Sequence, residues 1–262
     1  MLECVVNISE GRRPEVVAAI AATAGADLLD VHRDADHNRS VLTLVGVDAP
    51  RAVATAAVAA LDLRSHQGVH PRIGVVDVVP FVALDGAEPG DAVAARDAFG
   101  SWAAHDLALP GFAYGPERTL PEVRRGAFAD LRPTWGPPTP HPTAGAVAVG
   151  ARPVLVAYNL WLAPGTDLAV ARRVARAVRS PEVRALGLAV GTRVQVSMNL
   201  VAPEVVGPAD VWDRVAVLAP VERAELVGLV PGAALERVPE ARWDQLDLSP
   251  ERTIEARRAR RS

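Results

Sequence analysis

The order of strands and helices predicted for the first 79 residues constrains the fold more than any other feature of the chain. Apolar runs that alternate or are rich in β-branched residues predict four strands, at residues 2–8, 26–31, 41–45 and 73–79. Pro14 opens a predicted helix over 14–24, and Asp48 opens a second over 48–61. The resulting order, β-α-β-β-α-β, is that of a ferredoxin-like split βαβ unit. The sequence therefore predicts an α/β (α+β) fold.

Further helices and a strand are predicted after residue 79, and a proline-rich stretch follows them. Helices are predicted at 91–107 and 120–130, with a short strand at 110–114 between them. Residues 133–142 then hold five prolines, which lack backbone donors, and this predicts a connector between two lobes. A second βα-type segment is expected to begin at 145–152.

The second half of the chain repeats this alternation less regularly. Strands are predicted at 154–160 and 194–200, with a helix at 166–178 that places its apolar side chains on one face. A short helix at 209–215, an apolar run at 225–230 and an arginine-rich C-terminal helix that begins near Ser249 complete the expected elements.

Composition limits the classes of function. At 262 residues and 50% apolar, the chain can bury a sizeable core, and a net charge of −3 does not favour a polyanionic partner such as nucleic acid or a membrane surface. No apolar run approaches the ~18 residues of a membrane span, so we expect a cytoplasmic protein. All 28 basic residues are arginines, so anions must be bound by guanidinium groups or backbone N–H groups.

The stretch 66–81 concentrates the residues that could carry chemistry. His66, His70, Arg72 and Asp77 fall within twelve residues and lead into a buried apolar run. Gly68 and a proline argue against a helix here, so the polar part is predicted to be a loop against a strand, where chemistry is commonly placed.

Several motifs resemble the formiminotransferase family, and they occur in the family's order over nearly the whole chain. They are residues 3–11, the strand start Asn38-Arg39, the loop triplet His70-Pro71-Arg72, and the segments 145–159, 195–199 and 225–231. The resemblance is to the transferase half of formiminotransferase-cyclodeaminase and to its stand-alone bacterial relatives.

The resemblance implies an N-terminal subdomain at 1–152, a shortened C-terminal subdomain at 153–238 and a tail at 239–262. It also implies two ferredoxin-like lobes with a folate-binding crevice between them, usually in a homodimer. The family reaction moves a formimino group between N-formimino-L-glutamate and tetrahydrofolate, which makes tetrahydrofolate the expected co-substrate, with no metal. Any cyclodeaminase activity is expected on a separate chain.

The family's motifs also imply roles for particular residues. The histidine of its His-Pro-Arg triplet is the catalytic acid/base, which here is His70. One imidazole can serve as base and then as acid, because its ordinary pKa of ~6.5 lies near neutrality. The family's folate-binding stretch corresponds here to Gly136, Pro137, Pro138, Thr139, Pro140, His141, Pro142, Thr143, Ala144 and Gly145.

Both substrates carry carboxylates, so the substrate-binding candidates are three arginines in matched motifs: Arg39, Arg72 and Arg152. His66 is expected to orient the loop of His70 by a hydrogen bond. Of the other histidines, we expect His37 and His141 to be polar loop residues near the crevice, and His105, inside a helix, to be structural.

Two departures from the family pattern leave alternatives open. His32 stands where the family often has an acidic residue, and Ala144 stands where it often has an aromatic one. A folate-binding paralogue without turnover is therefore one alternative. The other is a metal-dependent hydrolase that uses His66, His70 and Asp77, which would require three or four ligands to converge at ~2.0–2.3 Å. The sequence does not distinguish formimino- from formyl-glutamate as donor.

Overall fold

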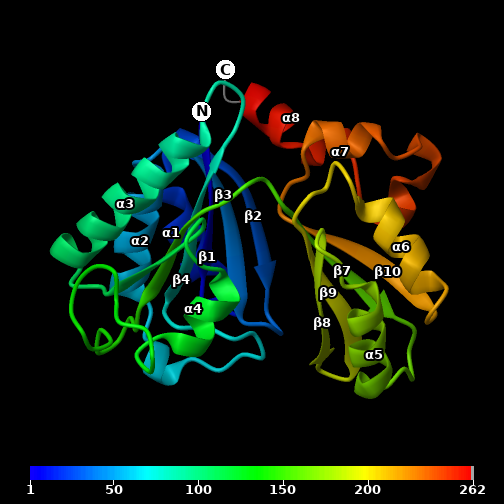
Figure 1. The fold of residues 1–262 in the computed structure, drawn as a ribbon, viewed down its shortest axis with the longest axis horizontal. Coiled ribbons are helices and arrows are strands. Elements are labelled where there is room, and N and C mark those ends of the chain that lie inside the picture. Colours follow the sequence, from blue (N-terminus) through cyan, green and yellow to red (C-terminus); the bar gives the residue numbers. More distant parts are fainter. Residues whose placement is uncertain (261–262) are drawn as a thin grey trace. The chain divides into compact units, whose positions relative to one another are not determined.

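The computed structural model describes residues 1–260 and divides into two compact units (Figure 1). The first runs from Met1 to Pro153, and the second begins at Val154. Each unit is built around one sheet, six-stranded in the first and four-stranded in the second. The predicted mixed α/β architecture with two lobes is confirmed.

The first unit contains six strands and four α-helices. They are β1 (Leu2–Ile8), α1 (Pro14–Ala22), β2 (Leu28–Asp34), β3 (Arg39–Val45), α2 (Ala49–Ala60), β4 (Val76–Ala83), α3 (Pro89–Asp106), β5 (Gly111–Tyr114), α4 (Leu120–Gly126) and β6 (Val147–Ala151). The sheet order is β2-β3-β1-β4-β6-β5. Its first four strands are antiparallel in the order of the predicted split βαβ unit, and β6 pairs in parallel with both β4 and β5.

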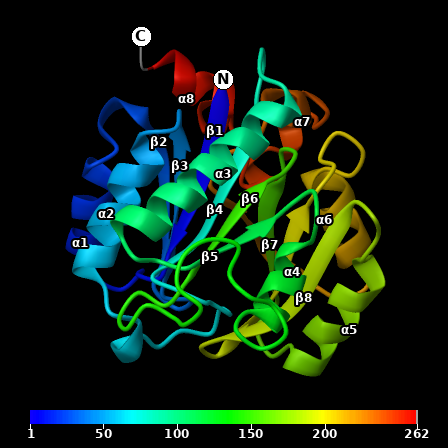
Figure 2. The same ribbon diagram turned by 60° about the vertical axis from the view of Figure 1, so that its left-hand side comes forward.

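The two faces of this sheet are covered differently (Figure 2). Helices α1, α2 and α3 pack on one face, where Ile20, Val53 and Phe99 join a core with inward side chains of β1, β3, β4 and β6. On the other face, α4 contributes Val123 to a smaller core that includes Phe112 of β5. Strands β4 and β6 are therefore buried on both faces, which explains their near-continuous apolar sequences.

The predicted connector at 133–142 is wrong as a boundary between lobes. Strand β6 follows it and pairs with β4 and β5 of the first sheet, so the proline-rich stretch and residues 145–152 both belong to the first unit. Proline stops regular structure, but it does not mark a change of domain. Here it shapes a loop whose start is tied to β5, because the N–H of Gly111 donates to Trp135 O at 3.0 Å.

The second unit repeats the split βαβ order. Its elements are β7 (Val156–Leu162), α5 (Leu168–Val178), β8 (Val183–Val190), β9 (Arg193–Leu200), α6 (Pro208–Ala216), β10 (Val221–Val227), α7 (Gly232–Glu236) and α8 (Ile254–Ala259), with short 3-10 turns over Glu240–Arg242, Asp244–Leu246 and Pro250–Arg252. The sheet order is β10-β7-β9-β8, all antiparallel.

Strand β8 has no counterpart among the sequence predictions. Gly187 lies in its middle and Leu186 is exposed, so its sequence lacks a clear alternating pattern. A Cβ at Gly187 would lie 2.4 Å from the backbone of Ala171, so glycine is required for α5 to approach the strand. Beyond residue 238, Leu246 and Ile254 are buried, and the Tyr158 hydroxyl donates to Leu246 O at 2.7 Å, so residues 239–260 pack on the second unit.

Replacing Gly100 with alanine should destabilise the first unit, although alanine favours helices. A Cβ at Gly100 would lie 2.4 Å from the ring of Trp135, and the resulting overpacking costs roughly 1–3 kcal/mol of unfolding free energy. Gly90, in the first turn of the same helix, has no atom within 4 Å of an added Cβ. In urea unfolding, Gly100→Ala should lower the midpoint while Gly90→Ala should not. Equal effects would contradict the packing argument.

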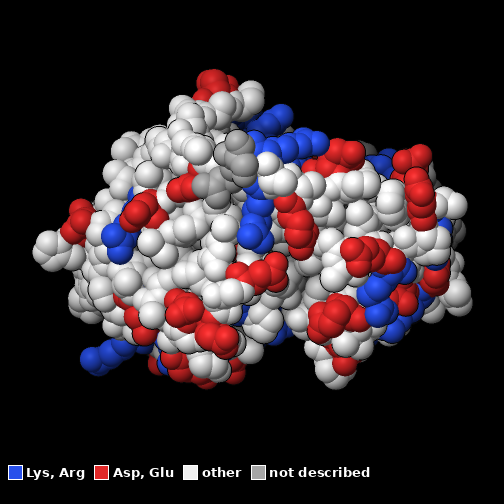
Figure 3. Space-filling model, turned by 90° about the horizontal axis from the view of Figure 1, so that it is seen from above, with Lys and Arg blue, Asp and Glu red and all other residues white. Residues whose placement is uncertain are grey.

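Two general surface properties bear on function. On the face shown in Figure 3, acidic and basic side chains of the described residues are interspersed, a pattern that does not favour a polyanionic partner. Across residues 1–260, every helix falls short of the length and apolarity that crossing a membrane requires.

Candidate active site

Asp77 is the charged residue around which the candidate site is assembled. It lies near the start of β4, where the register against β1 shifts between Asn7 and Ile8. Val76 packs in the larger core, on the face covered by α1, α2 and α3, and Val78 packs in the smaller core on the face of α4. Because the strand is irregular here, the side chain of Asp77 lies among polar partners rather than in the larger core. Its side chain is fully buried. The expected strand over 73–79 therefore begins later, at Val76, and residues 73–75 are irregular.

Two arginines from distant elements bind the Asp77 carboxylate. Arg39 Nη1, at the start of β3, and Arg124 Nη2, on α4, each lie 2.6 Å from Asp77 Oδ2. Asp77 Oδ1 accepts from the N–H of Ile73 at 2.8 Å. Burial alone would raise the pKa of Asp77, but the charges of Arg39 and Arg124 outweigh it, so the pKa is lowered. Asp77 is therefore ionised at neutral pH.

Arg39 connects this carboxylate to the catalytic candidate. Its Nη2 donates to Asn7 Oδ1 at 2.8 Å, and its Nη1 lies 3.0 Å from His70 Nδ1. His70 Nδ1 also lies 2.7 Å from Pro71 O. The two contacts belong to different tautomers: an unprotonated Nδ1 accepts from Arg39, whereas a protonated Nδ1 donates to Pro71 O and leaves Nε2 unprotonated. In this form His70 can act as a general base through Nε2.

The surroundings keep His70 neutral. Burial, together with the positive charges of Arg39 and Arg124, lowers the pKa of His70 to about 2, although Asp77 opposes them. The ordinary pKa near neutrality, on which the sequence argument relied, therefore does not apply to the unliganded protein. Burial and these charges therefore make His70 a weak proton acceptor in the unliganded protein.

We expect the ring signals of His70 to stay constant between pH 5 and 8 in an NMR titration of the unliganded protein. Because the folded state keeps this ring unprotonated while the unfolded chain would protonate it below about pH 6.5, acidification through this range should favour unfolding. A His70 midpoint near 6.5 would contradict the electrostatic description.

The cluster around His70 carries excess positive charge. Arg39, Arg72 and Arg124 provide three positive charges, and Asp77 provides one negative charge. Arg72 lies in the same loop, where its Nη2 donates to Gly68 O, and the charge of Asp77 acts on it. The cluster is therefore suited to bind a carboxylate.

Of the three arginines predicted to bind substrate, the structure brings Arg39 and Arg72 near His70 but not Arg152. Arg152 follows the last residue of β6, whereas Asp77 lies level with the start of that strand, because Val78 pairs with Ala148. About five residues of strand separate the two ends, or roughly 16 Å. Arg152 instead donates to Pro153 O at 3.0 Å.

Arg124 is the main residue of this cluster that the sequence analysis missed. It lies 47 positions after Asp77, in a helix whose sequence shows only two adjacent arginines near its end. It donates to Pro71 O as well as to Asp77, so it holds the loop of His70 and the carboxylate together. Only the packing of α4 against β5 and β6 reveals this role.

The predicted folate-binding stretch lies against the loop of His70. Thr143 O accepts from the N–H of Leu63 at 2.7 Å, and Ala144 O accepts from Val75 N–H at 2.9 Å. Exposed side chains are concentrated in its middle, at Pro138, Thr139 and Pro140. The middle of the stretch is therefore an exposed loop beside the candidate catalytic residue. Its last residues hold the stretch in place through backbone hydrogen bonds.

The remaining histidines have structural partners. His141 Nδ1 accepts from the N–H of Ala144 at 3.0 Å, which stabilises the end of the same stretch. His66 Nε2 lies 2.9 Å from Asn38 O and thus holds the loop against β3. His105 is exposed at the end of α3, with its Nδ1 2.5 Å from Asp106 Oδ1.

His37 lies near His70 in a loop. It is buried at the turn between β2 and β3, and its Nδ1 is 2.5 Å from Asp34 Oδ2. The ring centroids of His37 and His70 are 6.3 Å apart, with an interplanar angle of 67°. The site therefore contains two imidazoles.

The residues of the metal-site alternative do not form a ligand set. Asp77 Oδ2 accepts from two guanidinium groups and Oδ1 from a backbone N–H. In the described chain, residues 1–260, no three His, Cys, Asp or Glu side chains are grouped so that they could hold a metal ion.

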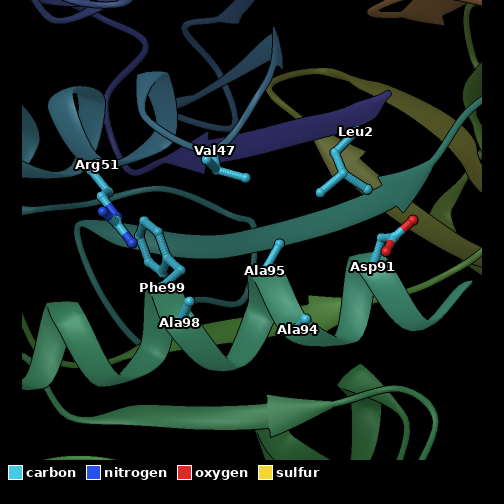
Figure 4. Close-up of a pocket in the computed structure, with 8 residues that line it drawn as sticks. All are labelled: Leu2, Val47, Arg51, Asp91, Ala94, Ala95, Ala98 and Phe99. Atoms are coloured by element: carbon cyan, nitrogen blue, oxygen red, sulfur yellow. The ribbon is translucent and has the colours of Figure 1, made fainter. Parts of the chain in front are cut away.

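A separate hollow of about 270 Å³ lies on the opposite face of the first sheet (Figure 4). It is lined by Leu2, Val47, Arg51, Asp91, Ala94, Ala95, Ala98 and Phe99. Leu2 packs against the larger core, beneath α3, whereas Asn7 and Arg39 face away from that core. This hollow is therefore not part of the His70 site.

In the second unit, a polar group accompanies two of the quoted motifs. Glu225 of β10 accepts from Trp161 Nε1 at 2.8 Å and from Asn159 Nδ2 at 3.1 Å, both on β7. Asn159 is buried, and the guanidinium of Arg223 lies 4.6 Å from the centre of the Trp161 ring. The group links the two neighbouring strands through side chains as well as backbone.

Comparison with known proteins identifies the family of this chain. Residues 1–152 match the model of the formiminotransferase domain, N-terminal subdomain. The chain belongs to the formiminotransferase family.

Relatives of known activity extend the match over most of the chain. A glutamate formimidoyltransferase of Streptococcus pyogenes serotype M1 is 34% identical over 277 residues, which cover 92% of each chain. One from Thermoplasma acidophilum is 33% identical, covering 90% of this chain and 89% of its own. A formimidoyltransferase-cyclodeaminase of Gallus gallus is 35% identical over 90% of this chain, but the match spans only 51% of that relative. The chain thus spans about half the length of the bifunctional relatives.

The two departures from the family pattern have different surroundings. Ala144 is fully buried in the larger core, so its side chain offers no stacking surface. His32 lies on β2, paired with Val41 of β3. Arg39 Nη1 lies 2.6 Å from Asp77 Oδ2 and 3.0 Å from His70 Nδ1, so the charged cluster is assembled despite both departures.

Proposed function

We propose that this chain is a glutamate formimidoyltransferase that moves a formimino group between N-formimino-L-glutamate and tetrahydrofolate. The observation that carries the proposal is the buried cluster of Arg39, Asp77 and Arg124 beside His70, in a chain that matches stand-alone glutamate formimidoyltransferases over nearly its whole length. The cluster supplies what this chemistry needs: a base, positive charge for carboxylates, and an exposed loop beside them.

His70 is proposed as the general acid/base. With Nδ1 directed at Pro71 O, its Nε2 can take the proton from the attacking nitrogen. A substrate carboxylate bound at the arginines would offset the charge that keeps the ring unprotonated, so the base strength of His70 would rise when substrate binds. Binding and proton transfer would thus be coupled through the same guanidinium groups.

Arg39, Arg72 and Arg124 are proposed to attract the carboxylates. Arg39 and Arg124 already share Asp77, which holds them rigid and leaves net positive charge on the cluster. Arg72 has only a backbone carbonyl as its hydrogen-bond partner in the loop, so it is the arginine best able to turn toward a ligand.

Tetrahydrofolate is proposed to bind at residues 136–145. The prolines Pro138 and Pro140 with Thr139 form an exposed, stiff segment, and backbone hydrogen bonds at Thr143 and Ala144 fix its end beside the His70 loop. Such a preordered loop loses little conformational entropy when it binds a ligand.

The experiment is to measure glutamate release from N-formimino-L-glutamate with and without tetrahydrofolate. The proposal predicts release that requires tetrahydrofolate and saturates with both substrates. Release without folate would favour a hydrolase, and folate binding by calorimetry without release would favour a paralogue that has lost turnover. The expected homodimer, the absence of a metal requirement and the cytoplasmic location stay predictions from the sequence.

A further inference from the structure

The turn between β2 and β3 holds a second imidazole that the proposed mechanism does not use. Both oxygens of the Asp34 carboxylate are committed to this turn. Oδ1 accepts from the N–H groups of Asp36 and His37 at 2.8 Å each, and Oδ2 lies 2.5 Å from His37 Nδ1. The side chain of His37 is therefore fixed in one orientation, with Nδ1 directed at Asp34, and only 7% of the residue is exposed.

The spacing of the two rings suits a shared ligand group. The ring of His37 lies edge to face with that of His70, with centroids 6.3 Å apart. The two rings are therefore near enough to approach the same substrate molecule. Nδ1 of His37 faces Asp34 Oδ2, and Nδ1 of His70 lies near both Pro71 O and Arg39 Nη1.

The two imidazoles stand in opposite electrostatic surroundings. Arg39 and Arg124 disfavour the protonated form of His70. His37 instead contacts a carboxylate that is ionised: burial alone would raise the pKa of Asp34, but hydrogen bonds from the ring and the N–H of His37 lower it. The ring of His70 thus stays unprotonated beside two arginines, whereas the ring of His37 contacts the Asp34 carboxylate. Pairs of groups in opposed environments are how one site supplies both an acid and a base.

Resting on the transferase function proposed above, we propose that His37, oriented by Asp34, is a second catalytic residue that protonates the departing glutamate nitrogen. The bond between the folate nitrogen and the formimino carbon forms, and His70 takes the proton of that nitrogen. The bond from carbon to the glutamate nitrogen then breaks, and its electron pair accepts a proton from the protonated ring of His37. Afterwards the proton on His70 returns to His37 through water, so the cycle gains and loses no proton.

Steady-state kinetics of His37→Gln and Asp34→Asn test this inference. His37→Gln should lower kcat by roughly 10²-fold or more, while KM for N-formimino-L-glutamate stays within about threefold, since acid catalysis acts on the barrier. Asp34→Asn should lower kcat in the same way. The double variant should be no slower than His37→Gln, because Asp34 acts through His37. Added imidazole should partly restore kcat in His37→Ala, which a merely structural role would not allow.

His105→Gln is the matched control, because His105 also lies 2.5 Å from a carboxylate but is exposed on α3. It should leave kcat unchanged. Circular dichroism establishes that each variant is folded. A kcat of His37→Gln within about threefold of the active wild type would overturn the inference and leave the transferase proposal standing. A wild type without turnover would overturn both. If His37→Gln does not fold, a folded Asp34→Asn with unchanged kcat would equally overturn the role of the pair.

Discussion

Replacing His70 with alanine should lower kcat by about 10²–10⁴-fold, the usual contribution of a positioned general acid/base. The affinity for tetrahydrofolate should change by no more than a few-fold, because proton transfer affects the barrier rather than ground-state binding. The fold should survive, since His70 is only partly buried in a loop and its hydrogen-bond partners keep other contacts: Arg39 with Asp77, and Pro71 O with Arg124. Steady-state kinetics and calorimetry on the same preparation measure both effects.

His66→Ala is the matched control for this variant. His66 lies in the same loop and holds it through Asn38 O, but it has no contact with the charged cluster beyond the coulombic influence of Arg72. His66→Ala should lower kcat at least tenfold less than His70→Ala does. If His70→Ala retains nearly full activity, the catalytic assignment is wrong.

Removing the charge of Asp77 should have the largest effect on stability. In Asp77→Asn, the guanidinium groups of Arg39 and Arg124 lose the carboxylate that both contact at 2.6 Å. Breaking a buried pair by removing one partner typically costs about 3–5 kcal/mol of unfolding free energy, because the remaining charge stays buried. Urea unfolding should show this loss, and activity should fall as the loop of His70 loses its anchor.

Asp62→Asn supplies the comparison for an exposed pair. Asp62 Oδ2 lies 2.6 Å from Arg64 Nη2, the same separation as in the buried pairs, but 69% of the Arg64 side chain and 36% of the Asp62 side chain are exposed. Exposed pairs contribute little, so this variant should leave the unfolding midpoint almost unchanged. Equal losses in the two variants would contradict the view that burial makes the Asp77 cluster important.

The strand and helix order of the first unit was predictable because its pattern is local. Alternation in β1 and β3 and the prolines at helix starts are visible within a few residues. The allocation of β6 was not predictable in this way, because whether β6 pairs with β4 or begins a second sheet depends on contacts between residues about 70 positions apart. Strand β8 was missed because glycine and exposed leucine removed its alternation.

The candidate site was predictable only in part, for the same reason. His70, Arg72 and Asp77 lie in one short stretch, and Arg39 lies in a motif of the family, so the sequence could identify these four residues as candidates. Arg124 reaches Asp77 only through the packing of α4. The lowered pKa of His70 results from burial and from charges on β3 and α4, neither of which the loop sequence shows. Arg152 matched a motif, yet it lies at the opposite end of its strand.

The central claim is that this chain transfers the formimino carbon to folate, and following that carbon tests it most directly. N-formimino-L-glutamate labelled with ¹³C in the formimino group would be incubated with the protein and tetrahydrofolate, and the label followed by NMR. The account predicts that the label moves to the folate at the rate at which glutamate appears, and that His70→Ala slows both equally. Label that stays on glutamate, or that is released to water without passing to folate, would contradict the claim.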